Sequence, residues 1–148
     1  MKRFLATNNS GVLLFQRIML GLVMFPHGMQ KLLGWWGGFG WDATLEAFQG
    51  RGIPYVAGVL VILGESLGAL GLIAGFLTRL CALGIVATQL GAFFMVHVPV
   101  GFFMNWSGRQ KGEGYEYALL ALALAIPLLI WGGGKASIDR ALSGRWGR

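Results

Sequence analysis

Long runs of apolar residues alternate with short polar segments along the chain. Four such runs cover about residues 11–33, 54–78, 80–104 and 115–133. A helix needs roughly 20 residues to cross about 30 Å of hydrocarbon, so each run is long enough to span a membrane. A helix buried in a soluble core would be shorter and would carry a polar stripe. The pattern therefore predicts an all-α protein, a bundle of four transmembrane helices that forms one domain over residues 1–148.

The segments between the runs predict two shorter helices. Residues 34–53 are rich in glycine and tryptophan, and Asp42 can cap a short helix there that ends at Gly50. We expect this helix to lie along the outer membrane interface. After a glycine break at 132–134, Ser137 can cap a second short helix.

Composition and charge agree with a membrane location. Hydrophobic residues make up 55% of the chain and charged residues only 12%, which argues against a soluble monomer. The formal net charge of +6 does not indicate nucleic-acid binding, because the basic residues are spread among the loops. Of the 12 basic residues, eight fall on the side expected to hold both termini and four on the other. The positive-inside rule thus predicts cytoplasmic N and C termini for a multi-pass protein of the bacterial inner membrane, with the lipid bilayer as its partner.

Six ionisable candidates lie within the predicted membrane helices, where a charge near the centre costs at least about 2.5–3.5 kcal/mol and is a functional candidate by default. They are Arg17, His27, Glu65 and His97 and, near the outer boundary, Lys31 and Glu116. Helix geometry places both histidines about 7–8 Å outward of the midplane and Glu65 near it. Pro26 and Pro99 lie beside the histidines, and helix kinks at these prolines would open a cavity. This arrangement favours a shared ligand or proton-transfer site formed by His27, His97 and Glu65.

The same residues also have structural interpretations, and the histidines can simply be satisfied within the bundle. Arg17 and Glu65 can form a buried ion pair, since a pair is tolerated where a lone charge is costly. Lys31 is expected to extend to the outer head groups. Glu116 starts a helix, where the helix dipole favours a carboxylate. The side chains expected to hold a bound molecule are Arg17, Gln30, Lys31, Gln89 and Glu116.

Some kinds of chemistry are excluded by the residues present. Cys81 is the single cysteine, so an intramolecular disulfide and a multi-cysteine metal site are ruled out. The chain has no Glu-x-x-His pair for a di-iron site and no phosphate-binding Gly-Lys-Ser/Thr loop. A redox function would therefore need a bound cofactor or quinone to carry the electrons.

Several motifs in a fixed order resemble one family. They are Arg17-x9-His27-Gly28-x-Gln30-Lys31-Leu32 around Phe25-Pro26-His27-Gly28, then Leu63-Gly64-Glu65, Gly75-Phe76-Leu77-Thr78-Arg79-Leu80, Glu116-Tyr117-Ala118-Leu119-Leu120 and Ser137-Ile138-Asp139-Arg140. The ordered set resembles the DoxX family of small bacterial membrane proteins over nearly the whole chain. The resemblance implies a four-helix inner-membrane protein of the oxidoreductase type, related to the membrane subunit of a thiosulfate:quinone oxidoreductase. It also implies a link to oxidative-stress defence with soluble redox partners.

The leading hypothesis is a membrane subunit that binds a quinone in a polar pocket of the bundle. His27 and His97 would bond the carbonyl oxygens and relay protons, Glu65 would accept a proton, and Arg17 would keep Glu65 ionised. Three alternatives stay open: a proton-coupled carrier centred on Glu65, haem binding by the two histidines, and a scaffold for a soluble redox enzyme. The sequence leaves open the substrate and whether the chain forms a homo-oligomer.

Overall fold

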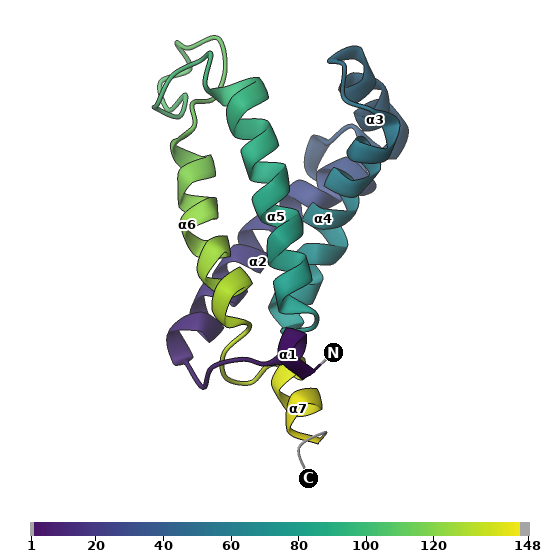
Figure 1. The fold of residues 1–148 in the computed structure, drawn as a ribbon. Coiled ribbons are helices and arrows are strands. Elements are labelled where there is room, and N and C mark those ends of the chain that lie inside the picture. Colours follow the sequence, from purple (N-terminus) through teal and green to yellow (C-terminus); the bar gives the residue numbers. More distant parts are fainter. Residues whose placement is uncertain (1, 146–148) are drawn as a thin grey trace.

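The computed structural model of the protein describes residues 2–145, and this part of the chain is helical with no β-strand. The helices are α1 (Lys2–Leu5), α2 (Gly11–Leu32), α3 (Gly40–Gly50), α4 (Tyr55–Ala74), α5 (Thr78–Ala92), α6 (Glu116–Trp131) and α7 (Ile138–Arg145). A 3-10 turn (Trp35–Gly37) follows α2, and a π-helical turn (η2, Phe93–His97) extends α5. Helices α2, α4, α5 and α6 form a bundle (Figure 1), which confirms the all-α prediction.

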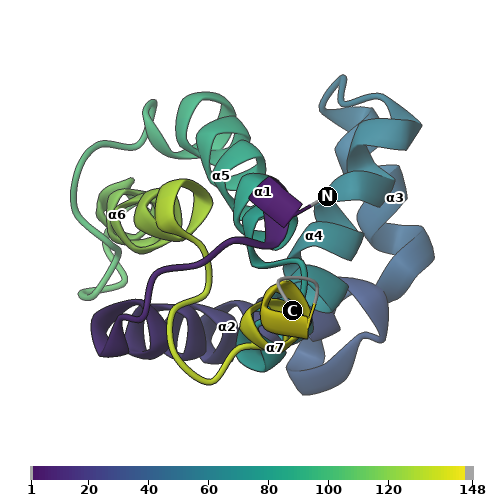
Figure 2. The ribbon, with the colours of Figure 1, turned by 60° about the horizontal axis from the view of Figure 1, so that its bottom comes forward.

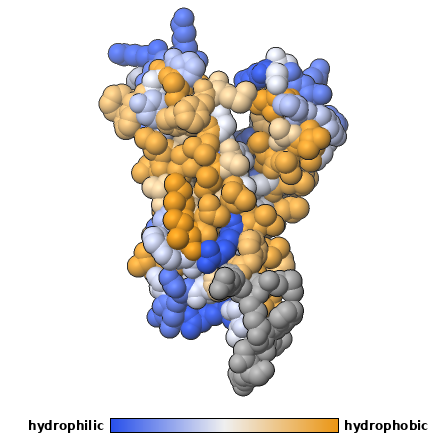
Figure 3. All heavy atoms as spheres, in the orientation of Figure 1, coloured by the Kyte–Doolittle hydropathy of each residue, from blue (hydrophilic) through white to orange (hydrophobic). Residues whose placement is uncertain are grey.

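The bundle has two distinct ends. Helices α1 and α7 lie together at one end, which we call the terminal end (Figure 1). Helix α3 and the loop over 98–115 lie at the opposite end, which we call the loop end. Three helical segments are long and apolar enough to cross a membrane: Gly11–Leu32, Tyr55–Ala74 and Thr78–His97. Helix α6 is a shorter apolar helix of 16 residues. Hydrophobic side chains dominate the middle of the visible surface, and hydrophilic ones gather toward its two ends (Figure 3). The number of crossings and the cytoplasmic termini stay predictions.

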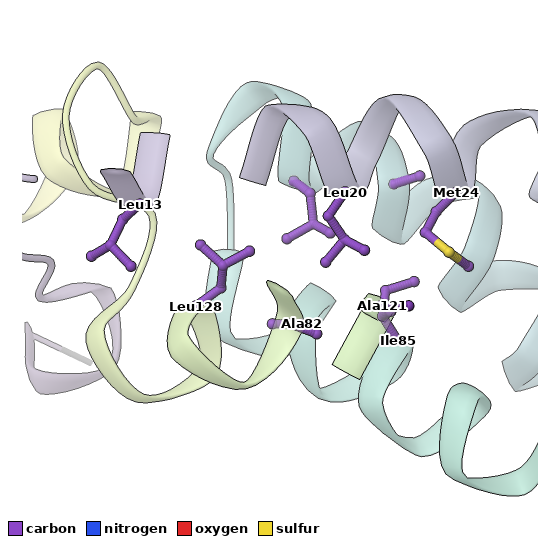
Figure 4. Packing of buried hydrophobic residues seen from close by; sticks show 10 residues of the cluster. Leu13, Leu20, Met24, Ala82, Ile85, Ala121 and Leu128 are labelled. Atoms are coloured by element: carbon purple, nitrogen blue, oxygen red, sulfur yellow. The ribbon is translucent and has the colours of Figure 1, made fainter. Parts of the chain in front are cut away.

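The buried apolar core joins the four bundle helices. Figure 4 shows Leu20 and Met24 of α2 pointing toward Ile85 of α5 and Ala121 of α6. The core residues are Leu13, Leu20, Met24, Ala69, Leu72, Ala82, Ile85, Ala121, Ala125 and Leu128. Because many of them are alanines, the helices approach closely, as is typical of membrane bundles.

One glycine sets where α2 crosses α4. A Cβ atom at Gly28 would lie 2.3 Å from the carbonyl oxygen of Glu65, so no larger residue fits there without moving a helix. The crossing places Glu65 at the level of the turn of α2 that carries His27 and Lys31. This contact is the origin of the polar cluster described below.

Two of the predicted helices end earlier than expected. Helix α4 stops at Ala74 because Gly75 adopts a left-handed conformation with φ of 67° and closes the helix. Helical structure after α5 stops at His97 instead of continuing to 104. Pro99 therefore lies in the turn that follows, and the predicted kink at Pro99 is wrong. Pro26 does lie within a helix, as predicted.

Both short helices are present. Helix α3 begins at Gly40, so Asp42 lies in its first turn and does not cap it, contrary to the expectation. Helix α7 is capped as expected, because the Oγ of Ser137 accepts a hydrogen bond of 3.2 Å from the backbone N–H of Arg140. Figure 2 shows α7 at the terminal end of the bundle, where the backbone N–H of Asp139 donates to the carbonyl oxygen of Gly75 at the end of α4 at 2.9 Å.

Candidate functional site

The guanidinium of Arg17 is satisfied by backbone and not by a carboxylate. Its side chain is 1% exposed. It donates hydrogen bonds to the carbonyl oxygens of Leu72, Ile73, Gly133, Lys135 and Ala136. Leu72 and Ile73 belong to the last turn of α4, where free carbonyls and the helix dipole both favour a cation. The predicted ion pair between Arg17 and Glu65 is therefore wrong, and Arg17 ties α2 to the end of α4 and to the segment after α6.

Two further charged residues complete this arrangement, which we call the terminal junction (Arg17, Arg79 and Asp139). Arg79 donates to the carbonyl oxygens of Leu129 at 2.9 Å and Ile130 at 2.6 Å in the last turn of α6. The carboxylate of Asp139 accepts the backbone N–H groups of Leu77 and Thr78, both at 2.8 Å, at the start of α5. Each charge thus complements a helix end of opposite polarity, which is a structural role.

A cavity of about 1440 Å³, open at the surface of the bundle, runs along α4 and α5 from near Phe76 to the loop end. The surface in Figure 3 is hollowed between the two lobes of that end. The walls of the cavity are mainly apolar and small residues of α4 and α5, including Gly64, Gly68, Gly84 and Gly91. The polar side chains that line it are His27, Lys31, Arg51, Glu65, Thr88, Gln89, His97, Glu113 and Tyr117. An apolar cavity with a few polar groups is the usual form of a small-molecule site.

Lys31 and Glu65 form an ion pair on the cavity wall. The Nζ of Lys31 lies 2.6 Å from the Oε2 of Glu65, and the side chains are 26% and 6% exposed respectively. The same Nζ also donates to the carbonyl oxygen of His27 at 3.4 Å. The expectation that Lys31 extends to the outer head groups is wrong, because the crossing at Gly28 brings Glu65 within its reach.

His27 shares its surroundings with Tyr117, a residue that sequence analysis did not select. Their ring centroids lie 5.5 Å apart, and both side chains line the cavity. The hydroxyl of Tyr117 lies 3.3 Å from the Sδ of Met24, and the Nε2 of Gln89 lies 3.9 Å from the same sulfur. Tyrosine at the start of an apolar helix looks like an interfacial anchor in the sequence, so nothing marked Tyr117 as part of a site. We call His27, Lys31, Glu65, Gln89 and Tyr117 the polar cluster.

His97 lines the same cavity from the π-helical turn after α5. Its Nδ1 lies 2.8 Å from the carbonyl oxygen of Glu113. A carbonyl only accepts, so Nδ1 carries the proton and Nε2 is left as an acceptor in the neutral ring. The structure therefore brings both predicted histidines to one cavity, with His27 against Tyr117 and His97 tied to the loop.

Besides Arg17, two more of the predicted contact residues lie outside the cavity lining. The Nε2 of Gln30 lies 3.4 Å from the carbonyl oxygen of Trp36, and Gln30 is outside the set of described residues that line the cavity. The Oε1 of Glu116 accepts from the backbone N–H of Met104 at 3.1 Å and from the Nε1 of Trp106 at 3.0 Å. Glu116 thus holds the loop over 98–115 in place. Its carboxylate accepts hydrogen bonds from the loop, whereas we expected it to stabilise the first turn of its own helix.

These features define a small helical membrane protein with a polar cluster in a cavity among its long apolar helices. The family model of DoxX matches residues 12–98. The chain belongs to the DoxX family, as its motifs indicated. The matched segment runs from α2 to the end of the π-helical turn and contains Arg17, His27, Lys31, Glu65, Gln89 and His97.

Two relatives cover most of the chain. "Inner membrane protein YqjF" of Escherichia coli (strain K12) is 30% identical over 133 residues, which are 90% of this chain and 93% of that protein. "Putative oxidoreductase CatD" of Bacillus subtilis (strain 168) is 26% identical over 115 residues, 78% of this chain and 76% of that protein. No solved structure matches the chain. The predicted localisation, a multi-pass protein of the inner membrane, is confirmed by the family and by the three apolar helices.

Proposed function

We propose that this protein binds a quinone, or a similar lipophilic redox molecule with ring carbonyl oxygens, and serves as the membrane subunit of a redox system. The observation that carries the proposal is the convergence of polar side chains from α2, α4, α5 and α6 on one part of a largely apolar cavity. Hydrogen-bonding groups at one place and apolar walls elsewhere suit a molecule with a polar ring and a hydrocarbon chain.

The polar cluster can serve the ring in two ways. His27, Gln89 and Tyr117 offer hydrogen-bond donors to carbonyl oxygens, and all three line the cavity. Glu65 and Lys31 lie beside them as a carboxylate and an ammonium 2.6 Å apart, a pair that can pass a proton to a reduced ring oxygen. Arg17 has no part in this proposal, since its donors are committed to the terminal junction.

Reduction of a quinone to its hydroquinone takes two electrons and two protons. The chain has a single cysteine and cannot deliver two electrons by closing an intramolecular disulfide. We therefore propose that a soluble redox enzyme supplies the electrons, while the cavity binds the quinone and its polar cluster supplies protons. The name of the Bacillus subtilis relative, which refers to an oxidoreductase, supports a redox role.

The main alternative is a proton-coupled carrier centred on Glu65. It is favoured by the position of this carboxylate on the wall of a membrane cavity. The ion pair weighs against it, because the ammonium of Lys31 occupies the carboxylate that a cationic substrate would need. Proton-driven uptake into liposomes that is lost in Glu65→Gln would support the carrier instead.

The direct test is mass spectrometry of molecules extracted from the gently purified protein. We expect a quinone with the wild type and much less with Gly91→Phe, because Gly91 lines the cavity and a Cβ there meets nothing within 4 Å. Leu90→Phe is the matched control, since Leu90 is 41% exposed and lies outside the described cavity lining. Absence of quinone from the wild type, or equal amounts in both variants, would contradict the proposal.

The same preparation tests haem binding by His27 and His97. Histidines are common axial ligands of haem iron, and bound haem shows an intense Soret absorption band. We expect no such band from protein purified out of membranes supplemented with haem. A Soret band lost in His27→Ala and in His97→Ala would replace the quinone with haem as the bound molecule.

A further inference from the structure

Met24 holds two hydrogen-bond donors on its sulfur at the edge of the cavity. It is 0% exposed and belongs to the residues that border the cavity, so its side chain lies directly beneath the cavity wall. The hydroxyl of Tyr117 lies 3.3 Å from this sulfur and the amide nitrogen of Gln89 lies 3.9 Å from it. The two donors come from α6 and α5, and the acceptor that they share is the Sδ of Met24 on α2.

A thioether is a weak acceptor, so both donors are held in place without being strongly satisfied. Gln89 is 4% exposed, which leaves its amide little water to bond. A carbonyl oxygen is a much better acceptor than a thioether, and a buried donor gains most from such a partner. Donor groups held by sulfur are therefore oriented in advance. Their hydrogen bonds can pass from the sulfur to a ligand oxygen with little loss of free energy.

We propose that Met24 is a positioning residue that holds Tyr117 and Gln89 until a carbonyl oxygen of the ligand takes over their hydrogen bonds. The inference rests on the proposed function and adds to it the contacts that select the ligand. The site then favours a ring that carries an acceptor oxygen over a hydrocarbon of the same size. Tyr117 and Gln89 touch the ligand, and Met24 acts only through them.

The positioning role predicts losses of quinone affinity for two substitutions. Tyr117→Phe removes a donor to the ligand, so we expect quinone affinity to fall about threefold to tenfold. Met24→Leu removes the sulfur that orients both donors at nearly constant volume, so we expect quinone affinity to fall about twofold. When Tyr117 is already phenylalanine, the loss from Met24→Leu shrinks, since the two residues act partly through one hydrogen bond.

The experiment measures binding to the full-length protein in lipid nanodiscs with two tritiated probes. One probe is a benzoquinone with a ten-carbon alkyl chain, and the other is decylbenzene, which has the same chain but no ring oxygen. The effects above are expected for the quinone and are expected to be absent for decylbenzene. Met29→Leu is the matched control, because Met29 is 5% exposed on the same helix and lies outside the described cavity lining.

The outcomes separate the two proposals. Strengthened or unchanged quinone binding in Met24→Leu, with wild-type binding intact, overturns the positioning role and leaves the proposed function standing. Equal affinity of the wild type for both probes overturns the proposed function and this inference with it. If circular dichroism shows that Met24→Leu does not fold, Tyr117→Phe decides alone, and quinone binding that is undiminished in it overturns the inference.

Discussion

The terminal junction and the polar cluster both hold charges inside the bundle, yet the partners of those charges differ. At the terminal junction, Arg17 and Arg79 bond to carbonyl oxygens that end helices, and Asp139 bonds to N–H groups that begin one. In the polar cluster, Lys31 and Glu65 bond to each other beside a cavity. Charge thus satisfies helix ends at the terminal junction, whereas in the polar cluster it forms a side-chain pair on the wall of the cavity.

This difference teaches how to interpret a charged residue in a membrane helix. Such residues are functional candidates by default, because burying them is costly. Helix ends already carry unsatisfied backbone groups and a partial charge, so a side chain placed there satisfies the fold and has nothing left for a ligand. Glu65 lies in the middle of α4 beside the cavity, and its partner among the described residues is a side chain, Lys31. The partner, and not the burial, separates the two roles.

The largest expected effect comes from breaking the terminal junction. Arg17→Met leaves five backbone carbonyls without their donor, so we expect the free energy of unfolding to fall by at least about 3 kcal/mol. Unfolding in mixed SDS micelles, followed by circular dichroism, measures this. Arg17→Lys should not restore stability, because an ammonium has only three donors and no planar fork. A stable Arg17→Met protein that no longer binds quinone would place Arg17 in the binding site and contradict its structural role at the terminal junction.

Breaking the ion pair of the polar cluster should cost less. Lys31→Met leaves the mostly buried Glu65 without its cation, so we expect a loss of about 1–3 kcal/mol in the same unfolding assay. Removing both charges in Lys31→Met/Glu65→Met should recover most of that stability without recovering quinone binding. If the double variant binds quinone as the wild type does, the pair is architectural as well.

Removing the cap at the start of α5 should cost less again. In Asp139→Ala the N–H groups of Leu77 and Thr78 lose their acceptor, which is expected to lower stability by about 0.5–2 kcal/mol. Quinone affinity should not change, since Asp139 lies at the terminal junction. Asp42→Ala serves as the control, as Asp42 is an exposed residue in the first turn of α3. A loss of affinity in Asp139→Ala with little change in stability would contradict the structural role.

The smallest expected effect compares two glutamines. Gln89 lines the cavity and Gln30 does not, so Gln89→Leu should weaken quinone binding about threefold while Gln30→Leu leaves it unchanged. Equilibrium binding of the alkyl benzoquinone in nanodiscs measures both. Equal losses in the two variants would show that the described cavity is not where the quinone binds.

Much of the fold could be predicted from the sequence because it depends on local patterns. Apolar runs of sufficient length fix the long helices, and Ser137 marks the start of α7 through a cap within its own turn. The same arithmetic failed at Pro99, because an apolar run of 25 residues over 80–104 does not reveal where the chain turns into a loop. The sequence also indicated the candidate residues His27, Glu65, Gln89 and His97, because polar groups are costly in a membrane helix and need a partner.

The sequence by itself determined the class of fold, the membrane setting and the residues that had to find polar partners. Tertiary structure decided which partners they found. The close contact of Gly28 with α4 places Glu65 within reach of Lys31, and the carbonyl groups at the end of α4 accept hydrogen bonds from Arg17. Met24 and Tyr117 entered the site because three helices meet there. Helix periodicity gives the face of a side chain but not the neighbour opposite that face, since the neighbour depends on where and at what height two helices cross.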